Sequence, residues 1–190
     1  MRRGAEMATG RKAAWVGRFL VWEHAVVEFA NRLHHRQALS RFFALVSRLG
    51  DGVGWYALMA ALFVVQGVKT VPALSQMLVT AATGVVIYAG LKRKTARPRP
   101  CDTSDRLQIS VAPLDKYSFP SGHTLHAVTF AILFAHHFPG TVWLVVPFAA
   151  LVMMSRLVLG LHYLTDVLAG AVIGALLALA ALYLGGLVAV

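Results

Sequence analysis

The sequence has few charged residues for its length, and acidic residues are the scarcest of these. Only 14% of its 190 residues are charged, whereas a soluble domain has about 25%. Hydrophobic residues make up 58% of the chain, and the mean hydropathy is +0.66. These values exclude an ordinary soluble globular domain and indicate an integral membrane protein.

Cysteine is almost absent, since Cys101 is the single one in the chain. A framework of internal disulfides is therefore excluded, and the redox state of the compartment is not inferred. A secretory signal peptide is not expected either. The apolar stretch that follows the basic N-terminus carries Arg18, Glu23 and Glu28, which do not fit an uninterrupted apolar signal segment.

The shortage of acids leaves a large positive charge. Eight Asp and Glu oppose 18 Lys and Arg, for a net charge of +10. The basic residues cluster at the N-terminus and between Lys92 and Arg106, beside apolar segments. The predicted partners are therefore the lipid bilayer with its anionic headgroups and a phosphate-bearing lipid substrate. Nucleic acid is not expected, and no obligate protein partner is inferred.

Long uncharged or nearly uncharged runs predict an all-α, polytopic membrane helical bundle. The run 71–91 would form a helix about 31 Å long, close to the thickness of the hydrocarbon core. Residues 92–120 are polar, basic and rich in proline, and we expect a loop there. Five spans are predicted, at residues 53–68, 71–91, 124–138, 142–161 and 167–190.

The first 50 residues have a different pattern. Residues 13–35 and 38–49 alternate apolar and charged positions at roughly helical spacing. We expect amphipathic helices lying in the membrane interface, with one more crossing, and thus six spans, as the alternative. In the second helix, one side would carry Leu39, Phe42, Phe43 and Val46. The whole chain, 1–190, is predicted to be one domain, with residues 1–50 amphipathic and 51–190 forming the catalytic bundle.

Counting crossings places three polar segments on the same face of the membrane. The loop 92–120 follows the second span, residues 120–123 open the third, and residues 155–166 end the fourth. Charged groups near spans are costly and usually functional. The residues predicted to converge on this face are Lys92, Arg97, Arg99, Ser121, His123, Arg156, His162 and Asp166.

These residue types suit the binding and transfer of a phosphoryl group. Lysine and arginine bind phosphate oxygens, and the N–H groups of a helix start at Ser121 and Gly122 would add to an anion site. Ser121 is also expected to cap that helix. Two histidines supply a nucleophile and a general acid. Asp166 follows His162 by four residues, so on one helix the two would share a face.

The three segments also carry motifs. "KRKTARPRP" at 92–100 fits Lys-x6-Arg-Pro, "PSGH" at 120–123 is the second element, and "SRLVLGLHYLTD" at 155–166 fits Ser-Arg-x5-His-x3-Asp. Together they resemble the tripartite signature of the type-2 phosphatidic-acid phosphatase family of membrane lipid phosphatases. "PSGH" alone is a weak signal, whereas three complete motifs in order are a specific one.

The resemblance implies a role for each matching residue. His162 would attack phosphorus to form a phosphohistidine, Asp166 would orient His162, and His123 would protonate the leaving oxygen. The phosphoryl oxygens would be held by Lys92, Arg99, Ser121, Gly122 and Arg156. The family uses no cofactor and no metal, which agrees with a sequence that lacks a carboxylate cluster for Mg²⁺.

Several neighbouring residues are left outside this set. Arg97 is undecided between a distal phosphate and a lipid headgroup, and His126 is interpreted as structural or as supporting the site. The acids Asp102, Asp105 and Asp115 are interpreted as solvated loop charges, and Cys101 as a small apolar residue.

The substrate is expected to be an amphiphile. Candidates are phosphatidic acid, phosphatidylglycerol phosphate, lipid A phosphates and undecaprenyl diphosphate, and the compact loop favours the last or another simple lipid phosphate. We expect a bacterial inner membrane, with the site on the periplasmic side and the C-terminus in the cytoplasm. Alternatives are a lipid phosphotransferase, a vanadium haloperoxidase and an inactive lipid carrier or scaffold. The hydrophobic composition argues against the haloperoxidase, and the intact histidines argue against the carrier.

Overall fold

The computed structural model describes the backbone of residues 2–188, and their side chains except at positions 2–14, 16 and 188. All regular structure in this range is helical. The α-helices are α1 (Arg2–Asn31), α2 (Gln37–Arg48), α3 (Gly54–Gln66), α4 (Val71–Thr95), α5 (Pro100–Thr103), α6 (Gly122–His137), α7 (Val142–Val158) and α8 (Leu164–Val188). Short turns of helix lie at Arg32–His35, Leu49–Val53, Gly67–Thr70 and Pro139–Thr141.

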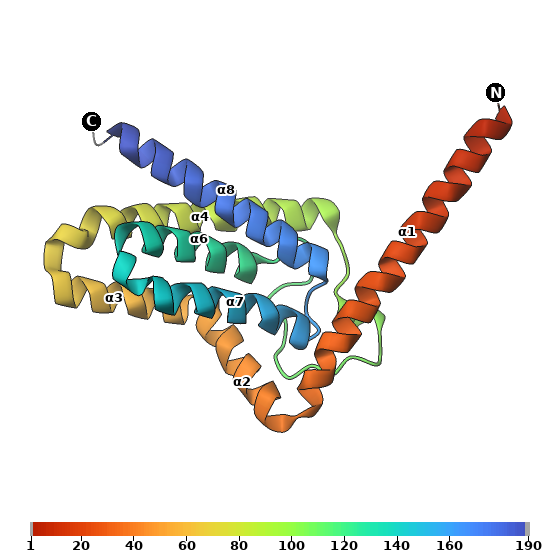
Figure 1. Ribbon diagram of the computed structural model, residues 1–190, viewed down its shortest axis with the longest axis horizontal. Coiled ribbons are helices and arrows are strands. Elements are labelled where there is room, and N and C mark those ends of the chain that lie inside the picture. Colours follow the sequence, from red (N-terminus) through yellow and green to blue (C-terminus); the bar gives the residue numbers. More distant parts are fainter. Residues whose placement is uncertain (1, 189–190) are drawn as a thin grey trace.

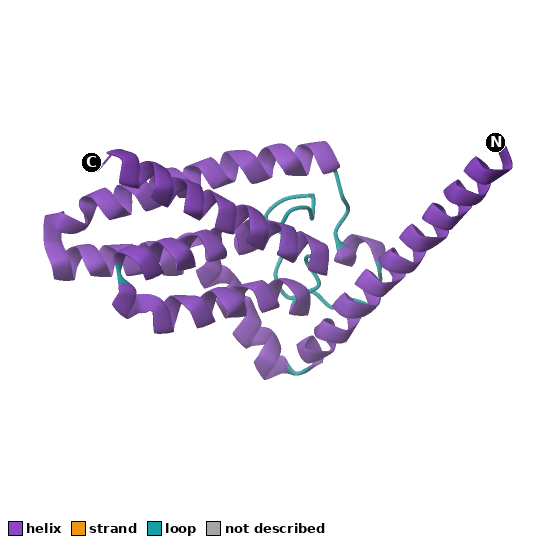
Figure 2. Cartoon of the chain, turned by 45° about the horizontal axis from the view of Figure 1, so that its top comes forward, coloured by secondary structure: helices purple, strands orange, loops and turns teal. Residues whose placement is uncertain are grey.

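The long apolar helices form a bundle around α6, which packs against α8, α7 and α4 (Figure 1). The irregular loops gather near one end of this bundle, as Figure 2 shows. Helix α8 begins at that end and runs to the opposite end, where the described chain stops. Helix α1 meets the bundle near the loop end and extends away from it at an angle (Figure 1).

The close packing of α6 on α8 depends on two glycines one turn apart. A Cβ at Gly170 would lie 2.5 Å from the carbonyl oxygen of Ser121, and a Cβ at Gly174 would meet the backbone of Leu125. Thr129 on α6 also donates a hydrogen bond to the Gly174 carbonyl, with an O···O distance of 3.0 Å. Small residues spaced by four let two membrane helices approach to backbone contact, which fixes the start of α6 against α8.

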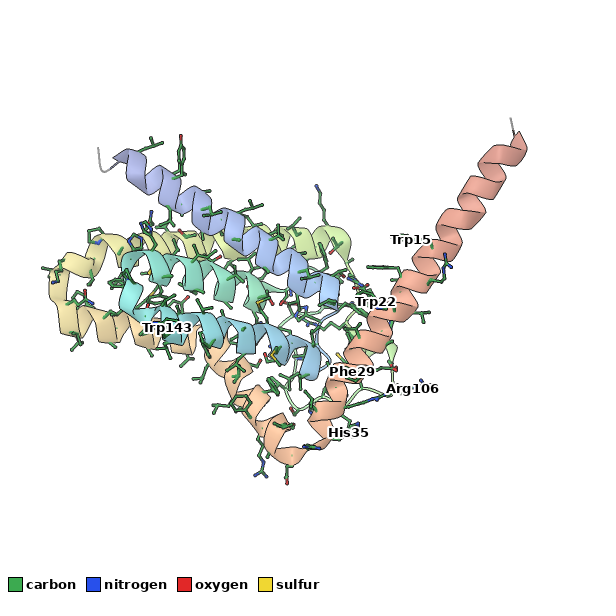
Figure 3. The ribbon with its side chains drawn as sticks, in the orientation of Figure 1. Trp15, Trp22, Phe29, His35, Arg106 and Trp143 are labelled. Atoms are coloured by element: carbon green, nitrogen blue, oxygen red, sulfur yellow. The ribbon has the colours of Figure 1, made fainter. Side chains whose placement is uncertain are left out.

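The outer surface of the bundle is apolar, as expected for a protein in lipid. Three stretches are long and apolar enough to cross a membrane: Gln37–Thr103, Pro139–Val158 and Leu164–Leu187. The first of them contains four α-helices, α2 to α5. Large apolar side chains point outward, including Val64, Val65 and Trp143, which are 81%, 80% and 88% exposed. Trp143 lies near the end of the bundle far from the loops (Figure 3). The chain is therefore an integral membrane protein.

The structure corrects three of the predicted boundaries. Helix α4 continues to Thr95, so Lys92 lies on a helix and not in a loop. The predicted loop 92–120 also contains the short helix α5. Helix α7 ends at Val158, before Gly160 with a φ of 68°, and α8 begins at Leu164. His162 therefore lies in a non-helical link, in the predicted break between the fourth and fifth spans, and the shared helix face considered for His162 and Asp166 does not apply.

The N-terminal region is more firmly attached to the bundle than an interface helix requires. Asn31, at the end of α1, donates hydrogen bonds to the carbonyl oxygens of Val158 and Gln108, at 2.8 and 2.9 Å. The exposed aromatic side chains Trp15, Trp22 and Phe29 lie along α1 (Figure 3).

On α2, the predicted apolar side is only partly correct. Phe43 and Val46 are buried, as expected, but Phe42 is exposed.

Candidate active site

A cavity of about 580 Å³ opens at the loop end of the bundle. It lies between the 49–53 turn, the end of α4, the loop before α6, the start of α6 and the link after α7. It is lined by Gly122 and by polar residues that include Asp51, Lys92, Arg99, Asp115, His123, Arg156 and His162. The structure thus brings together six of the eight residues predicted to form the site, while Ser121 and Asp166 lie buried behind it.

His162 is held with one ring nitrogen toward the cations of the cavity. Its Nε2 atom lies 3.2 Å from Nη1 of Arg99. A guanidinium group can only donate, so Nε2 accepts, and a neutral ring then carries its proton on Nδ1. Nδ1 faces Oδ2 of Asp166 at 3.6 Å. The lone pair of His162 is therefore on the nitrogen that faces the cavity, as a nucleophile requires.

The surroundings of His162 also keep it uncharged. The side chain is only 1% exposed. Burial lowers the pKa of His162 well below its ordinary value, and the positive charges of Arg156, Arg99 and Lys92 lower it further. His162 is consequently neutral at physiological pH.

Asp166 is fixed by two hydrogen bonds besides its approach to His162. The backbone N–H of Tyr163 donates to Oδ2 at 2.8 Å, and Nη1 of Arg97 donates to Oδ1 at 2.8 Å. The predicted proximity of Asp166 to His162 is thus achieved at the N-terminus of α8, where the helix dipole also favours a carboxylate.

The side chain of Arg97 is turned inward and pairs with carboxylates of the protein. In this arrangement it faces neither a distal phosphate nor a lipid headgroup, the two roles considered for it. Its Nη2 atom forms a 2.5 Å ion pair with Oε2 of Glu23 on α1, in addition to its bond to Asp166. Oε1 of Glu23 accepts from the backbone N–H of Thr165 at 3.2 Å and contacts the Thr165 hydroxyl. Sequence reasoning missed Glu23 as a supporting residue. The available signal was an acidic residue inside an otherwise apolar run.

Arg156 offers an unused donor to the cavity. Its side chain is only 2% exposed. Nη1 donates to the hydroxyl of Ser47 at 2.5 Å, whereas Nε has no partner among the described residues. A buried guanidinium N–H without a partner is costly, and an anion bound in the cavity would satisfy it.

The interpretation of Asp115 as a solvated loop charge is only half correct, because its side chain is 40% exposed but also pairs with two buried cations. Both of its carboxylate oxygens lie 2.7 Å from Nζ of Lys92, and Oδ1 also accepts from Nη2 of Arg99 at 2.8 Å. Burial alone would raise the pKa of Asp115, but the hydrogen bond from Lys92 and the charges of both cations outweigh it and hold that pKa below its ordinary value. A carboxylate thus bridges two of the three cations predicted to bind phosphate.

The start of α6 combines a capping residue with a cavity residue. The Ser121 hydroxyl accepts from the N–H of Thr124 at 3.3 Å, so the predicted cap is confirmed. The N–H of Ser121 donates to the carbonyl oxygen of Asp166 at 3.0 Å. The prediction that this N–H is available to phosphate is therefore wrong, whereas Gly122 does line the cavity.

The two histidines in the first half of α6 face different partners. Nε2 of His123 contacts a carboxylate oxygen of Asp51 in the turn before α3. His126 bonds through Nε2 to the carbonyl oxygen of Ala81 on α4 at 3.1 Å, although its ring also reaches the cavity. His126 therefore links α6 to α4, which is the structural role, one of the two interpretations made from the sequence.

The fold and the site define a class: an all-helical integral membrane protein with a cationic cavity built around two histidines at one end of the bundle. The chain belongs to the PAP2 superfamily, whose family model matches residues 73–187, more than half of the chain. The family predicted from the three motifs is thereby confirmed.

Individual relatives agree with this assignment. Decaprenylphosphoryl-5-phosphoribose phosphatase of Mycolicibacterium smegmatis is 34% identical over 131 residues, which are 66% of this chain and 67% of that protein. Three of the curated relatives are matched over 62–67% of their own lengths. The prediction of a phosphoric monoester hydrolase is consistent with relatives that are named as phosphatases.

Solved structures show the same fold. The Aquifex aeolicus LpxE structure has a TM-score of 0.72 at 26% identity, covering 84% of this chain and 93% of that one. A transmembrane PAP2-type phosphatidylglycerolphosphate phosphatase from Bacillus subtilis has a TM-score of 0.68 at 24% identity, covering 86% of this chain and 84% of that one.

Proposed function

We propose that this protein hydrolyses a lipid mono- or diphosphate in the membrane through a phosphohistidine on His162, without a metal. The favoured substrate is undecaprenyl diphosphate or another simple lipid phosphate, because the compact loop between α4 and α6 leaves little room to recognise an elaborate headgroup. The observation that carries the proposal is the neutral His162, whose lone pair on Nε2 faces the buried cations of the cavity and accepts a hydrogen bond from Arg99.

In the first step, Nε2 of His162 attacks phosphorus as the bond from phosphorus to the lipid oxygen breaks. Protonated His123 gives its proton to the leaving oxygen, and the lipid product departs. The imidazole of His162 becomes positively charged, and Asp166 stabilises it across the 3.6 Å approach to Nδ1. Lys92, Arg99 and Arg156 neutralise the phosphoryl oxygens, which is where most of the barrier is lowered.

In the second step, a water molecule attacks phosphorus and the bond to Nε2 breaks. His123, now neutral, takes a proton from this water. Inorganic phosphate is released, His162 returns to its neutral form, and His123 is again protonated. Every proton is accounted for within the pair of histidines, so the cycle requires no external acid.

We also propose how the chain crosses the membrane. Five crossings by α3, α4, α6, α7 and α8 agree with the alternating directions of these helices in the bundle. The site would face the periplasm of a bacterial inner membrane, with the C-terminus in the cytoplasm. Helix α1, which leaves the bundle at an angle, would lie at the membrane surface on the side of the site.

The test is phosphate release by the protein purified in detergent with EDTA. A panel of lipid phosphates, including undecaprenyl diphosphate and phosphatidic acid, is offered to the wild type and to His162→Ala. We expect the substitution to abolish release, because it removes the nucleophile. His136→Ala is the matched control, since His136 lies at the far end of α6 and outside this cavity.

Release that survives His162→Ala would remove the proposed nucleophile. A strict requirement for added Mg²⁺ would count against the metal-independent mechanism. A phosphotransferase uses the same phosphohistidine, so a second lipid is supplied as acceptor. Transfer of the phosphoryl group to that lipid in place of water would assign the alternative activity.

A further inference from the structure

The turn between α2 and α3 has a composition that the three motifs do not explain. Its sequence is Gly50-Asp51-Gly52, within the helical turn Leu49–Val53. A Cβ at Gly50 would lie 2.8 Å from a methyl group of Val152 on α7, so only glycine fits there. Gly52 has a φ of 128°, which side-chain-bearing residues rarely adopt. The two glycines fix the position of the acidic residue between them.

Asp51 points into the cavity and meets His123. A carboxylate oxygen of Asp51 lies within ion-pair distance of Nε2 of the imidazole, and this buried nitrogen forms no hydrogen bond with any other described group. The Asp51 side chain remains 26% exposed, so it is not part of the packed core. With Nε2 covered, Nδ1 is the nitrogen of His123 that remains to reach a substrate.

We propose that Asp51 is a positioning residue for the acid–base histidine, so that the site contains a second carboxylate–imidazole pair beside Asp166 and His162. This inference rests on the proposed function, because it assigns a partner to the general acid of that mechanism. Asp51 orients the ring of His123 through Nε2–H and stabilises the ring in its protonated form.

The charges around His123 explain why such a partner is needed. Arg156 on α7 and Lys92 on α4 both direct positive charge at this ring, and His162 becomes positive during the reaction. These charges and the burial of the ring all disfavour an imidazolium. Asp51 supplies a negative charge in direct contact with it. A phosphate dianion in the cavity would add to this effect.

The proton transfers balance with Asp51 unchanged throughout. In the first step the Nδ1 proton of His123 passes to the lipid oxygen as its bond to phosphorus breaks. The ring is then neutral and retains its proton on Nε2, directed at Asp51. In the second step Nδ1 takes a proton from the attacking water. Asp51 neither gains nor loses a proton, in the manner of the aspartate of a catalytic triad.

The experiment compares two leaving groups in detergent solution. Phosphatidic acid releases a strongly basic alkoxide, which needs a proton, whereas p-nitrophenyl phosphate releases a weakly basic phenolate, which does not. We expect Asp51→Asn to lower kcat for phosphatidic acid at least tenfold, within the range assigned to general acid catalysis. Its kcat for p-nitrophenyl phosphate should change less than threefold, and Asp51→Glu should restore part of the lost activity.

Two further variants make the outcome decisive. Asp105→Asn removes an exposed acid of the loop and should leave both rates unchanged. His123→Ala should show the same selective loss as Asp51→Asn, and a larger one. Equal loss on both substrates in Asp51→Asn, or no loss, overturns the positioning role even when His123→Ala behaves as expected. Activity retained in His162→Ala would instead contradict the proposed function itself. If Asp51→Asn does not fold, the ratio of the two rates in Asp51→Glu decides, because an unchanged ratio contradicts the proposal.

Discussion

At the scale of single residues, the site is a balance between cations and carboxylates. Lys92, Arg99 and Arg156 are almost completely buried beside His162. Such a concentration of positive charge is tolerated because each cation has polar partners, among them the carboxylate of Asp115 and the hydroxyl of Ser47. Burial and these same charges keep His162 neutral, so in the proposed mechanism the cations that hold the phosphate also help to keep the nucleophile unprotonated.

This balance predicts how the activity changes with pH. Arg99→Gln removes a positive charge next to His162, so the pKa of His162 rises toward its ordinary value. The nucleophile is then protonated at a higher pH, and the acidic limb of kcat/KM for p-nitrophenyl phosphate should move upward. The quantity to measure is the pH midpoint of that acidic limb. This midpoint can be compared with the wild type even though Arg99→Gln lowers the absolute rate.

Arg106→Gln provides the control for this pH profile. Arg106 is an exposed cation at the loop end (Figure 3) and does not line the cavity. Its replacement should leave the acidic limb in place. A limb that stays fixed in Arg99→Gln, or moves to lower pH, would contradict the electrostatic account of His162.

At the scale of helices, close contact between α6 and α8 positions the site. Ser121 and His123 begin α6, while Asp166 lies in the first turn of α8. The glycines at 170 and 174 allow these two helix starts to approach until backbone N–H and C=O groups bond across them. Packing deep in the bundle therefore determines the distances in the cavity.

A single methyl group tests this contact. Gly170→Ala would place a Cβ 2.5 Å from the Ser121 carbonyl oxygen, so the helices must separate. We expect the thermal unfolding midpoint in detergent to fall by several degrees, and phosphate release to fall with it. Gly90→Ala is the matched control, because a Cβ on that exposed α4 glycine meets nothing within 4 Å. Equal midpoints in the two variants would show that the close contact is not required.

The helices and their contacts also show which features of the molecule could be predicted from the sequence. The apolar runs and motifs identified the bundle helices and the three segments of the site, because both signals are local. The Asp115 bridge and the Glu23–Arg97 pair were missed, because each joins residues 16 or more positions apart and has no periodic pattern. The helix end at Val158 was missed because Leu159 and Leu161 are as apolar as the helix before them.

At the scale of the whole molecule, the site lies at one end of the bundle and the described C-terminal end of α8 at the other. The loop that carries Arg99 and Asp115 and the turn at Gly67–Thr70 are joined by α4 alone. If α4 crosses the membrane, these two segments must therefore lie on opposite sides of it.

Cysteine labelling tests this arrangement. In a Cys101→Ser background, Asp105→Cys and Val68→Cys place one thiol at each end of α4, and both positions are exposed. In intact spheroplasts, a membrane-impermeant maleimide should label Asp105→Cys and should label Val68→Cys only after the membrane is opened. The reverse pattern would invert the proposed orientation. Labelling of both positions would contradict the crossing by α4.

The bridge from Asp115 to Lys92 and Arg99 has a consequence for substrate choice. If Lys92 and Arg99 bind the phosphate group as proposed, this carboxylate is a tethered competitor for it, with an effective concentration on the order of millimolar or above. A dilute water-soluble phosphate ester must displace it from solution, and so must the inorganic phosphate that the reaction would release. A lipid phosphate is itself concentrated by confinement to the two dimensions of the bilayer. The Asp115 carboxylate thus favours lipid phosphates, which the membrane concentrates, over dilute water-soluble phosphate esters.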